Sequence, residues 1–218
     1  MNLIVTCGPA YAPIDGTRRL TNHSTGGLGA FLCAHFAAAG HRVLCLRGSG
    51  ATERQAAPGV EVREFGTNED LAALLAEAAR EPVDAVLHAA ALCDFGAGVI
   101  RDLEGNAVLS GKIPSRAPGY LLTLLPLPKV IVSLRRLFPQ AFLAGWKYGT
   151  EGGEEKMAAQ GRRQLEEART DLCVLNGPGF GDGYGLLTPA GEMEKAPTRQ
   201  DLAGGLLQRI KQRIEKRP

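Results

Sequence analysis

Short runs of apolar residues alternate along this chain with segments in which apolar residues recur every three or four positions. The short runs are typical of buried strands, and the periodic segments are typical of amphipathic helices. The runs predict strands over residues 3–7, 41–48, 60–65, 83–92, 142–146 and 171–176, the last of these ending the sheet. The periodic segments predict helices over residues 25–39, 68–80, 154–169 and 199–216.

This alternation of strand and helix predicts an α/β fold, a three-layer doubly wound (Rossmann-like) and mostly parallel sheet with helices on both faces. We expect residues 1–218 to form a single nucleotide-binding domain with a small hairpin or flap inserted at about 95–120, where the pattern loosens. Residues 107–113 are expected to form an arm of that hairpin, and residues 124–130, rich in proline, to lead into a short helix. Ligands of such sheets gather at the carboxyl ends of the strands, so functional residues are expected there.

The composition is that of a globular domain, with 44% hydrophobic and 22% charged residues among 218. The 25 Lys and Arg residues nearly balance the 23 Asp and Glu residues, so charge gives no reason to expect nucleic acid or an anionic membrane as partner. No apolar stretch is long enough to span a membrane and no targeting segment is seen, which predicts a cytoplasmic protein. The five cysteines are scattered without a CxxC pair, and we expect buried thiols.

A long loop rich in glycine and polar residues follows the first predicted strand. Its glycines, which include Gly8, Gly26 and Gly27, let backbone N–H groups approach an anion, and the next helix adds its dipole. The loop therefore predicts a phosphate site of a nucleotide. The alternative is that these glycines only permit a tight turn and close helix packing.

Polar residues of the same loop admit two interpretations each. Ser24 or Thr25 is expected to cap the following helix. Asn22 has the chemistry to orient a ligand carbonyl or phosphate, although Asn is also common in left-handed turns. His23 is either a general base or a solvated surface residue.

Four stretches carry a resemblance to a known family. They are PIDGTRRLTNHSTGGLG at 13–29, HAAALCDF at 88–95, GKI at 111–113 and the run at 127–151, and DLCVLN at 171–176 adds a weaker echo. In this order they resemble phosphopantothenoylcysteine synthetase (phosphopantothenate–cysteine ligase), the domain also found at the C-terminal end of the bifunctional coenzyme A biosynthesis flavoprotein. The likeness spans most of the chain, from Val5 to about Leu187.

The resemblance implies a ligase that joins 4'-phosphopantothenate to cysteine through an acyl-nucleotide intermediate, with CTP or ATP as cosubstrate and Mg²⁺ as cofactor. Lys112 matches the lysine that helps the acyl-nucleotide to form, and Asn22 matches the asparagine that binds this intermediate. Without the resemblance, Lys112 would be read as a solvated surface lysine. Further matches to substrate-binding positions are Arg18, Ser24, Thr25 and Gly26.

The nucleotide is expected to contact Gly8, Asp94 and Trp146. Asp94 matches the residue that faces the base, where a carboxylate can accept an amino N–H, although an Asp after a strand is often a turn cap. Trp146 falls where the family has a Phe that packs on the base, and the competing interpretation is a core tryptophan.

The chain also departs from the family pattern. Gly27 replaces a lysine of the first loop, and Gln164 and Ala168 replace two lysines that contact the triphosphate. The cations left to take over this role are Arg162, Arg163 and Arg169. In addition, Asn176-Gly177-Pro178 replaces an Ala-Asn-Asp sequence after the last predicted strand.

These departures leave open a non-catalytic nucleotide-binding paralogue. A nicotinamide-dependent reductase fits the same fold class, but the Tyr-x-x-x-Lys pair of the short-chain type is missing from the sequence. Members of the family pair through the segment that corresponds to Lys112, so the resemblance also implies a homodimer.

Overall fold

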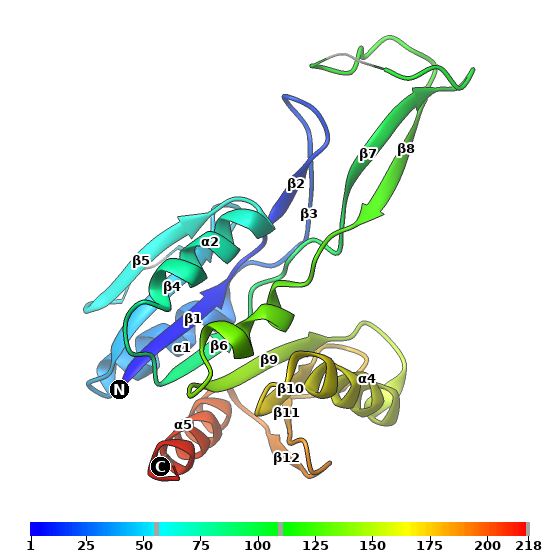
Figure 1. Ribbon diagram of the computed structural model, residues 1–218. Helices are drawn as coiled ribbons and strands as arrows, with labels where there is room; N and C mark the ends of the chain where they lie inside the picture. Colours follow the sequence, from blue (N-terminus) through cyan, green and yellow to red (C-terminus); the bar gives the residue numbers. More distant parts are fainter. Residues whose placement is uncertain (55–56, 109–110, 217–218) are drawn as a thin grey trace.

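The computed structural model describes residues 1–54, 57–108 and 111–216, and its centre is a sheet of eight strands (Figure 1). The strand order is β12-β11-β10-β9-β6-β1-β4-β5, in which β11 pairs antiparallel with both β10 and β12, and the remaining neighbours pair in parallel. The bounds are β1 (Asn2–Cys7), β4 (Arg42–Gly48), β5 (Val60–Phe65), β6 (Ala85–His88), β9 (Phe142–Tyr148), β10 (Leu172–Asn176), β11 (Tyr184–Leu187) and β12 (Met193–Ala196). The predicted α/β, Rossmann-like fold with a mostly parallel sheet is confirmed.

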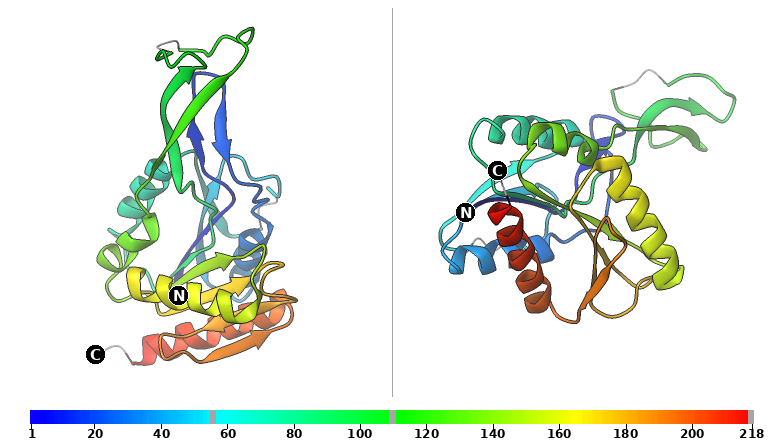
Figure 2. Two further views of the ribbon diagram at one scale, coloured as in Figure 1. Left: turned by 90° about the vertical axis from the view of Figure 1, so that its right-hand side faces the viewer. Right: turned by 60° about the horizontal axis from the view of Figure 1, so that its bottom comes forward.

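Helices cover both faces of the sheet (Figure 1, Figure 2). One face, called the α1 face below, carries α1 (Gly27–Ala38) and α5 (Arg199–Glu215). The other, called the α4 face, carries α2 (Asn68–Ala78), the short pair η1 (Val130–Ser133) and α3 (Leu134–Leu137), and α4 (Gly153–Ala168). Both faces are buried, as is usual for a parallel sheet.

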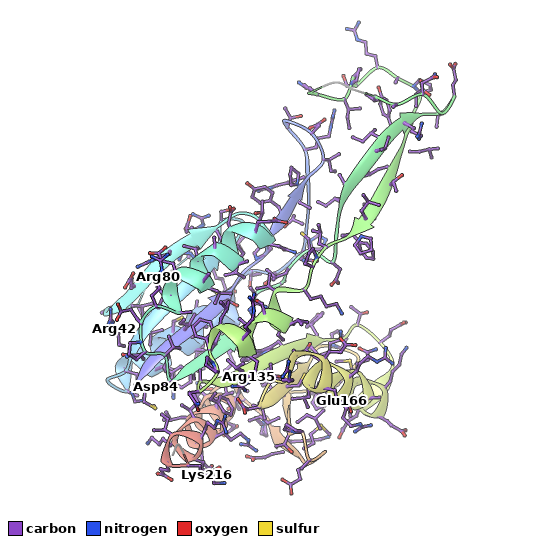
Figure 3. All side chains as sticks on the ribbon, in the orientation of Figure 1. Arg42, Arg80, Asp84, Arg135, Glu166 and Lys216 are labelled. Carbon is purple, nitrogen blue, oxygen red and sulfur yellow. The ribbon has the colours of Figure 1, made fainter. Side chains whose placement is uncertain are left out.

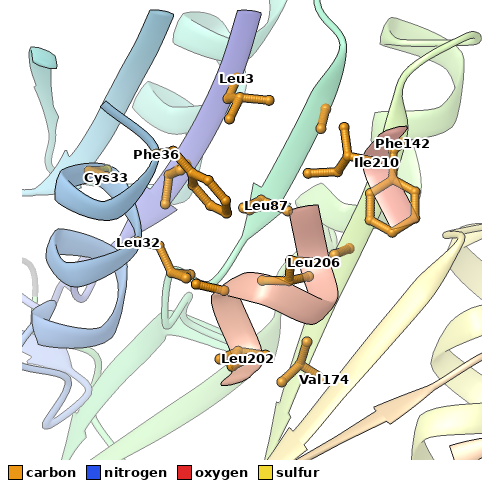
Figure 4. Packing of buried hydrophobic residues seen from close by; sticks show 14 of the residues in the cluster. Leu3, Leu32, Cys33, Phe36, Leu87, Phe142, Val174, Leu202, Leu206 and Ile210 are labelled. Atoms are coloured by element: carbon orange, nitrogen blue, oxygen red, sulfur yellow. The ribbon is translucent and has the colours of Figure 1, made fainter. Parts of the chain in front are cut away.

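The core of the α1 face is formed by apolar residues from helices and strands that lie far apart in the sequence. Figure 4 shows Phe36 of α1 and Leu206 of α5 near Leu3 and Leu87 of the strands, and all four are at most 2% exposed. Ile4 points to the opposite face because side chains alternate along a strand. The five cysteines are buried and unpaired, as predicted.

The start of α1 differs from the prediction. Its N-cap is Gly26, whose φ of 83° lies in the left-handed region, and neither Ser24 nor Thr25 occupies that position. The Thr25 hydroxyl still accepts a hydrogen bond from the Gly27 N–H at 3.2 Å. Glycine is favoured at position 26 because it adopts positive φ without steric cost, and because a Cβ there would crowd Ala51 at 3.1 Å.

A two-stranded antiparallel arm projects away from the sheet (Figure 1, Figure 2). It consists of β7 (Phe95–Asp102) and β8 (Tyr120–Pro126), so the hairpin insertion is present, but the prediction that residues 107–113 form its arm was wrong. That stretch lies beyond the end of β7, where Ala107 forms an isolated bridge with Arg101, and residues 109 and 110 are outside the described part.

Several short strands had no counterpart in the prediction. Residues 120–126 form β8 before the short helices begin, and β11 and β12 follow β10, which was expected to end the sheet. Within the first loop, β2 (Tyr11–Pro13) and β3 (Arg19–Thr21) form a small hairpin. Strands β2, β3 and β12 are short and β8 is mostly exposed, so they lack the buried apolar run that marks the central strands. Strand β11 is buried but has only four residues.

Among the described residues, the helices are all too short or too polar to cross a membrane.

Candidate functional site

The segments that follow β1 and β6 run side by side at the carboxyl edge of the sheet. The Ala91 N–H donates to the Gly8 carbonyl, and the Ala10 N–H donates to the Ala91 carbonyl, each at 3.0 Å. The Ala90 N–H donates to the Thr6 hydroxyl at 3.2 Å. These contacts fix the backbone of residues 89–91, the three alanines that follow β6, at the edge where ligands of such folds bind.

Asn22 joins these two segments. Its Nδ2 donates to the Ala91 carbonyl at 3.2 Å and to the Leu92 carbonyl at 2.9 Å. Because both bonds use the amide nitrogen, the acceptor Oδ1 is left for a ligand donor. Asp94 is exposed and lies two residues after Leu92. Its backbone carbonyl accepts a hydrogen bond from the Leu127 N–H at 2.8 Å, which holds the turn in place. The structure therefore brings Asn22 and the Asp94 turn together.

The amino end of α1 already faces a carboxylate. Thr25 Oγ1 donates to Glu53 Oε1 at 3.0 Å, and the backbone N–H of Glu53 donates to the Thr25 carbonyl, also at 3.0 Å. A Cβ added to Gly27 would overlap the Glu53 carboxyl group, so the absence of a side chain at position 27 makes room for Glu53. A phosphate bound at this helix end would meet the negative charge of Glu53.

Arg18 and Lys112 belong to a second group, at the tip of the β2–β3 hairpin. Arg18 Nη1 donates to Asp15 Oδ2 at 2.5 Å and to the Ile113 carbonyl at 3.1 Å. The Gly16 N–H donates to the Gly111 carbonyl at 2.9 Å. These bonds dock the hairpin tip against the segment that carries the exposed Lys112.

The two groups lie at opposite ends of strand β3, which separates Arg18 from Asn22. At about 3.4 Å per residue, an extended segment of this length spans up to about 14 Å. Hydrogen bonds from the Ile113 N–H and from the loop lower the pKa of the Asp15 carboxyl, which keeps this carboxylate charged beside Arg18.

A cavity of about 280 Å³ opens on the α4 face between η1, β9 and α4. It has three cationic side chains, Lys129, Lys147 and Arg163, against one carboxylate, Glu167. Its remaining lining is Ile131, Val132, Gln160, Gln164 and Ala168. An excess of positive charge in a concave site suits a polyphosphate.

The cavity relates directly to the sequence departures. Gln164 and Ala168, which replace two family lysines, line it, and so does Arg163, whereas Arg162 is not among its lining residues. Sequence reasoning missed Lys129 and Lys147. The available signal was their position, since Lys147 lies in the last residues of a buried strand and Lys129 directly precedes a helix.

The two aromatic residues near the end of β9 lie in different surroundings. Trp146 packs against the core of the α1 face, and its Nε1 is buried without a hydrogen-bond partner in the described part of the chain. Tyr148, two residues on, is 64% exposed.

A larger cavity of about 470 Å³ lies at the opposite edge of the sheet, between α2 and the beginnings of β1, β4 and β5. Arg42 and Arg80 line it, and Figure 3 shows both at the end of the molecule away from the arm. None of the predicted site residues is among its lining residues.

No group of three or more His, Cys, Asp or Glu side chains is placed to hold a metal ion within residues 1–54, 57–108 and 111–216. Mg²⁺ needs less from a protein, since one or two carboxylates and the phosphates of a substrate commonly complete its shell. Glu167, the carboxylate among the described residues that line the cationic cavity, fits that requirement.

Comparison with known proteins finds a matching family model and a curated relative. A family model described as the DNA/pantothenate metabolism flavoprotein C-terminal domain matches residues 1–212. The coenzyme A biosynthesis bifunctional protein CoaBC of Thermococcus kodakarensis is 32% identical over 174 residues, which are 80% of this chain and 40% of that protein. The chain thus spans less than half the length of this relative.

Solved structures show the same fold. The DNA/pantothenate metabolism flavoprotein from Streptococcus pneumoniae superimposes with a TM-score of 0.86 at 24% identity, covering 97% of this chain and 99% of that one. A variant of Cab2 in complex with phosphopantothenate-cysteine gives a TM-score of 0.79 at 15% identity, covering 98% of this chain and 87% of that one.

Proposed function

This chain belongs to the DNA/pantothenate metabolism flavoprotein C-terminal domain family, and from that premise we propose that it is a cytoplasmic phosphopantothenate–cysteine ligase of coenzyme A biosynthesis. In the proposed reaction, a carboxylate oxygen of 4'-phosphopantothenate attacks the α-phosphorus of CTP or ATP and releases pyrophosphate. The cysteine amine then attacks the acyl carbon, forms the amide and releases the nucleoside monophosphate. Activation is needed because a carboxylate has no viable leaving group.

The observation that carries this proposal is the position of Asn22. Its Nδ2 binds the carbonyls of Ala91 and Leu92, so Oδ1 is held at the carboxyl edge of the sheet, next to the turn that carries Asp94. In our proposal Asn22 orients the acyl-nucleotide, and Asp94 accepts an amino N–H of the base. A ligand position fixed in this way lowers the entropic cost of bringing the reacting groups together.

For the triphosphate we propose the cavity on the α4 face. Lys129, Lys147 and Arg163 supply the positive charge that the family places on the lysines replaced here by Gln164 and Ala168. Cations fixed near the α-phosphorus stabilise the charge that develops as pyrophosphate leaves. Mg²⁺ bound with the nucleotide would supply further charge neutralisation.

We further propose that the active unit is a homodimer in which one chain's arm brings Lys112 and Arg18 to the Asn22 of the other. Two observations support this. Within one chain the extended strand β3 separates Arg18 from Asn22. In addition, the arm leaves large apolar side chains exposed, among them Phe95 at 48%, Leu121 at 59% and Leu125 at 52%, and apolar surface of this kind is usually covered by a partner.

A second candidate function is a nucleotide-binding paralogue without ligase activity. The contact of Glu53 with the amino end of α1 favours it, because a negative charge stands where the family loop carries a lysine. Such a paralogue would bind CTP or ATP without releasing pyrophosphate.

The test is a pyrophosphate-release assay with the purified chain, phosphopantothenate, cysteine, Mg²⁺ and either CTP or ATP. We expect release with at least one nucleotide, and none when phosphopantothenate is omitted. A protein that is folded by circular dichroism but releases no pyrophosphate with either nucleotide would disprove the ligase.

A further inference from the structure

Tyr148 is a large exposed side chain at the edge of the sheet where the proposed site lies. It is the last residue of β9, and it is 64% exposed. Its hydroxyl makes no hydrogen bond to the described residues. The ring therefore serves neither the core nor a polar network of this chain.

The ring of Tyr148 is nevertheless supported from one side. A Cβ added to Gly177 would lie 2.8 Å from Cε2 and 2.9 Å from Cδ2 of the ring, so the ring rests directly on the backbone at Gly177. This backbone is itself fixed, because the Gly149 N–H donates to the Asn176 carbonyl at 3.0 Å. Gly177 has a φ of 103°, which a residue with a side chain rarely adopts.

Gly177 belongs to the Asn-Gly-Pro sequence that distinguishes this chain from the family pattern. Any side chain at this position would collide with the Tyr148 ring and with the Gly149 carbonyl at 2.5 Å. The substitution at 177 and the aromatic residue at 148 are thus sterically linked. Together they leave a flat aromatic face open at the end of β9.

The neighbours of Tyr148 have the complementary chemistry. Lys147 precedes it and points to the other face, where it lines the cationic cavity. Trp146 shares the α1 face with Tyr148 but packs into the core, so its ring is not free at the edge. A cation and an exposed aromatic ring on consecutive residues match the two ends of a nucleotide, the phosphates and the base.

We propose that Tyr148, rather than Trp146, is the platform on which the base of the nucleotide stacks, while Lys147 binds its phosphates. This inference rests on the proposed function, because it specifies the nucleotide subsite of that ligase. Stacking tolerates any base, since every base has a π face. Tyr148 therefore contributes affinity for CTP and for ATP, and it does not select between them.

The experiment is isothermal titration of the full chain, with Mg²⁺, against CTP, ATP and inorganic tripolyphosphate, which has no base. Tyr148→Leu keeps an apolar side chain but removes the ring, and Tyr148→Phe keeps the ring. We expect Tyr148→Leu to weaken nucleotide binding by about tenfold or more and to leave tripolyphosphate binding unchanged. Tyr148→Phe should bind nucleotides within about twofold of the wild type, since the hydroxyl has no partner.

Lys147→Ala is the corresponding variant that tests the contact with the phosphates. It should weaken tripolyphosphate and nucleotides alike, by about threefold to tenfold. Because Tyr148 is exposed, the substitutions should leave the melting temperature unchanged, which verifies folding.

The possible outcomes separate the two proposals. Wild-type nucleotide affinity in Tyr148→Leu, or an equal loss for nucleotides and tripolyphosphate, would overturn the stacking role and leave the ligase standing. A wild-type chain that binds neither CTP nor ATP would overturn both.

Discussion

Asp15 Oδ2 accepts a hydrogen bond from the Ile113 N–H at 3.0 Å, and this bond joins segments separated by 98 residues. Arg18 reinforces the contact by donating to the Ile113 carbonyl at 3.1 Å. The loop after β1 therefore holds both peptide groups of Ile113, the residue that follows Lys112. Two sequence motifs that are far apart in the chain form one structural unit at the tip of the β2–β3 hairpin.

Asp15→Asn should loosen this unit. An amide side chain accepts a backbone hydrogen bond more weakly than a carboxylate and loses the ion pair with Arg18. We expect faster amide exchange over residues 111–114 and slower pyrophosphate release, and Glu104→Gln elsewhere in the insertion is the control. Unchanged exchange in Asp15→Asn would show that the carboxylate does not hold this segment.

The same contact should depend on pH. The folded-state pKa of Asp15 is lowered by the hydrogen bond from Ile113, so its stabilising contribution is fully present above the unfolded value, about 4. It should be lost as the pH falls below that value towards the folded pKa. Hydrogen exchange of the 111–114 segment, corrected for the intrinsic rate, should show protection at pH 6 and a decline in strongly acidic solution that Asp15→Asn does not show.

Asn22→Ala should reduce turnover much more than nucleotide affinity. The substitution removes the acceptor proposed to orient the acyl-nucleotide, and losing one such group typically costs about 100-fold in rate. Nucleotide affinity, measured by titration, should change by less than about threefold, because the phosphates and the base have other partners. His23→Ala is the control for the neighbouring exposed side chain, and a similar loss in that variant would point to His23 as a general base.

Arg163→Ala should weaken binding of the triphosphate more than Arg162→Ala. The two residues are adjacent on α4, and both are exposed, but only Arg163 lines the cationic cavity. We expect about a threefold to tenfold loss of tripolyphosphate affinity for Arg163→Ala, decreasing at high salt. Equal effects of the two substitutions would mean that general surface charge, and not the cavity, attracts the ligand.

His88 should make the fold sensitive to acid. It is 6% exposed, its Nδ1 lies 2.9 Å from Thr6 Oγ1, and burial lowers its pKa to about 4. Between the unfolded value of about 6.5 and this folded value, the unfolded chain binds more protons, so the free energy of unfolding falls as the pH falls. The loss should approach about 3 kcal/mol near pH 4. Urea titrations of the wild type and His88→Gln should differ in the slope of stability against pH, and parallel slopes would contradict this origin.

Arg135→Lys should destabilise the junction between α3, β9 and β10. The Arg135 guanidinium binds Asp171 at 2.7 Å and the carbonyls of Ala141 and Arg169 at 2.9 Å and 3.1 Å. A lysine ammonium cannot reproduce this planar set of hydrogen-bond donors, so we expect the free energy of unfolding to fall by about 2–3 kcal/mol in denaturant titrations. Arg136→Lys, at the adjacent exposed position, should change stability by less than about 0.5 kcal/mol.

The central strands and long helices were predictable from the sequence because each buries an apolar run or stripe. Residues 60–65 have the predicted bounds of β5, and α2 begins at Asn68, as predicted, with the Thr67 side chain as its cap. The arm was misplaced because Leu121, Leu124 and Leu125 do not pack in the core, so their pattern carries no core periodicity. The edge strand β12 was missed because its residues are largely polar and exposed.

The site was predictable only in part, for a similar reason. Asn22 and Asp94 follow predicted strands, so their meeting at one edge follows from the topology. The cavity, in contrast, depends on how η1, β9 and α4 pack, and no spacing in the sequence relates Lys129 to Lys147 or Arg163. The contact between Gly27 and Glu53 likewise joins loops after two different strands.

The most direct test of the ligase follows the carboxylate oxygen. Phosphopantothenate labelled with ¹⁸O in its carboxylate would be incubated with the chain, cysteine, Mg²⁺ and CTP or ATP. We expect the label in the phosphate of the released nucleoside monophosphate, because the carboxylate oxygen stays bonded to the α-phosphorus when the amide forms. Label in inorganic phosphate alongside a nucleoside diphosphate, or amide formation with no label in any phosphate, would contradict the acyl-nucleotide route.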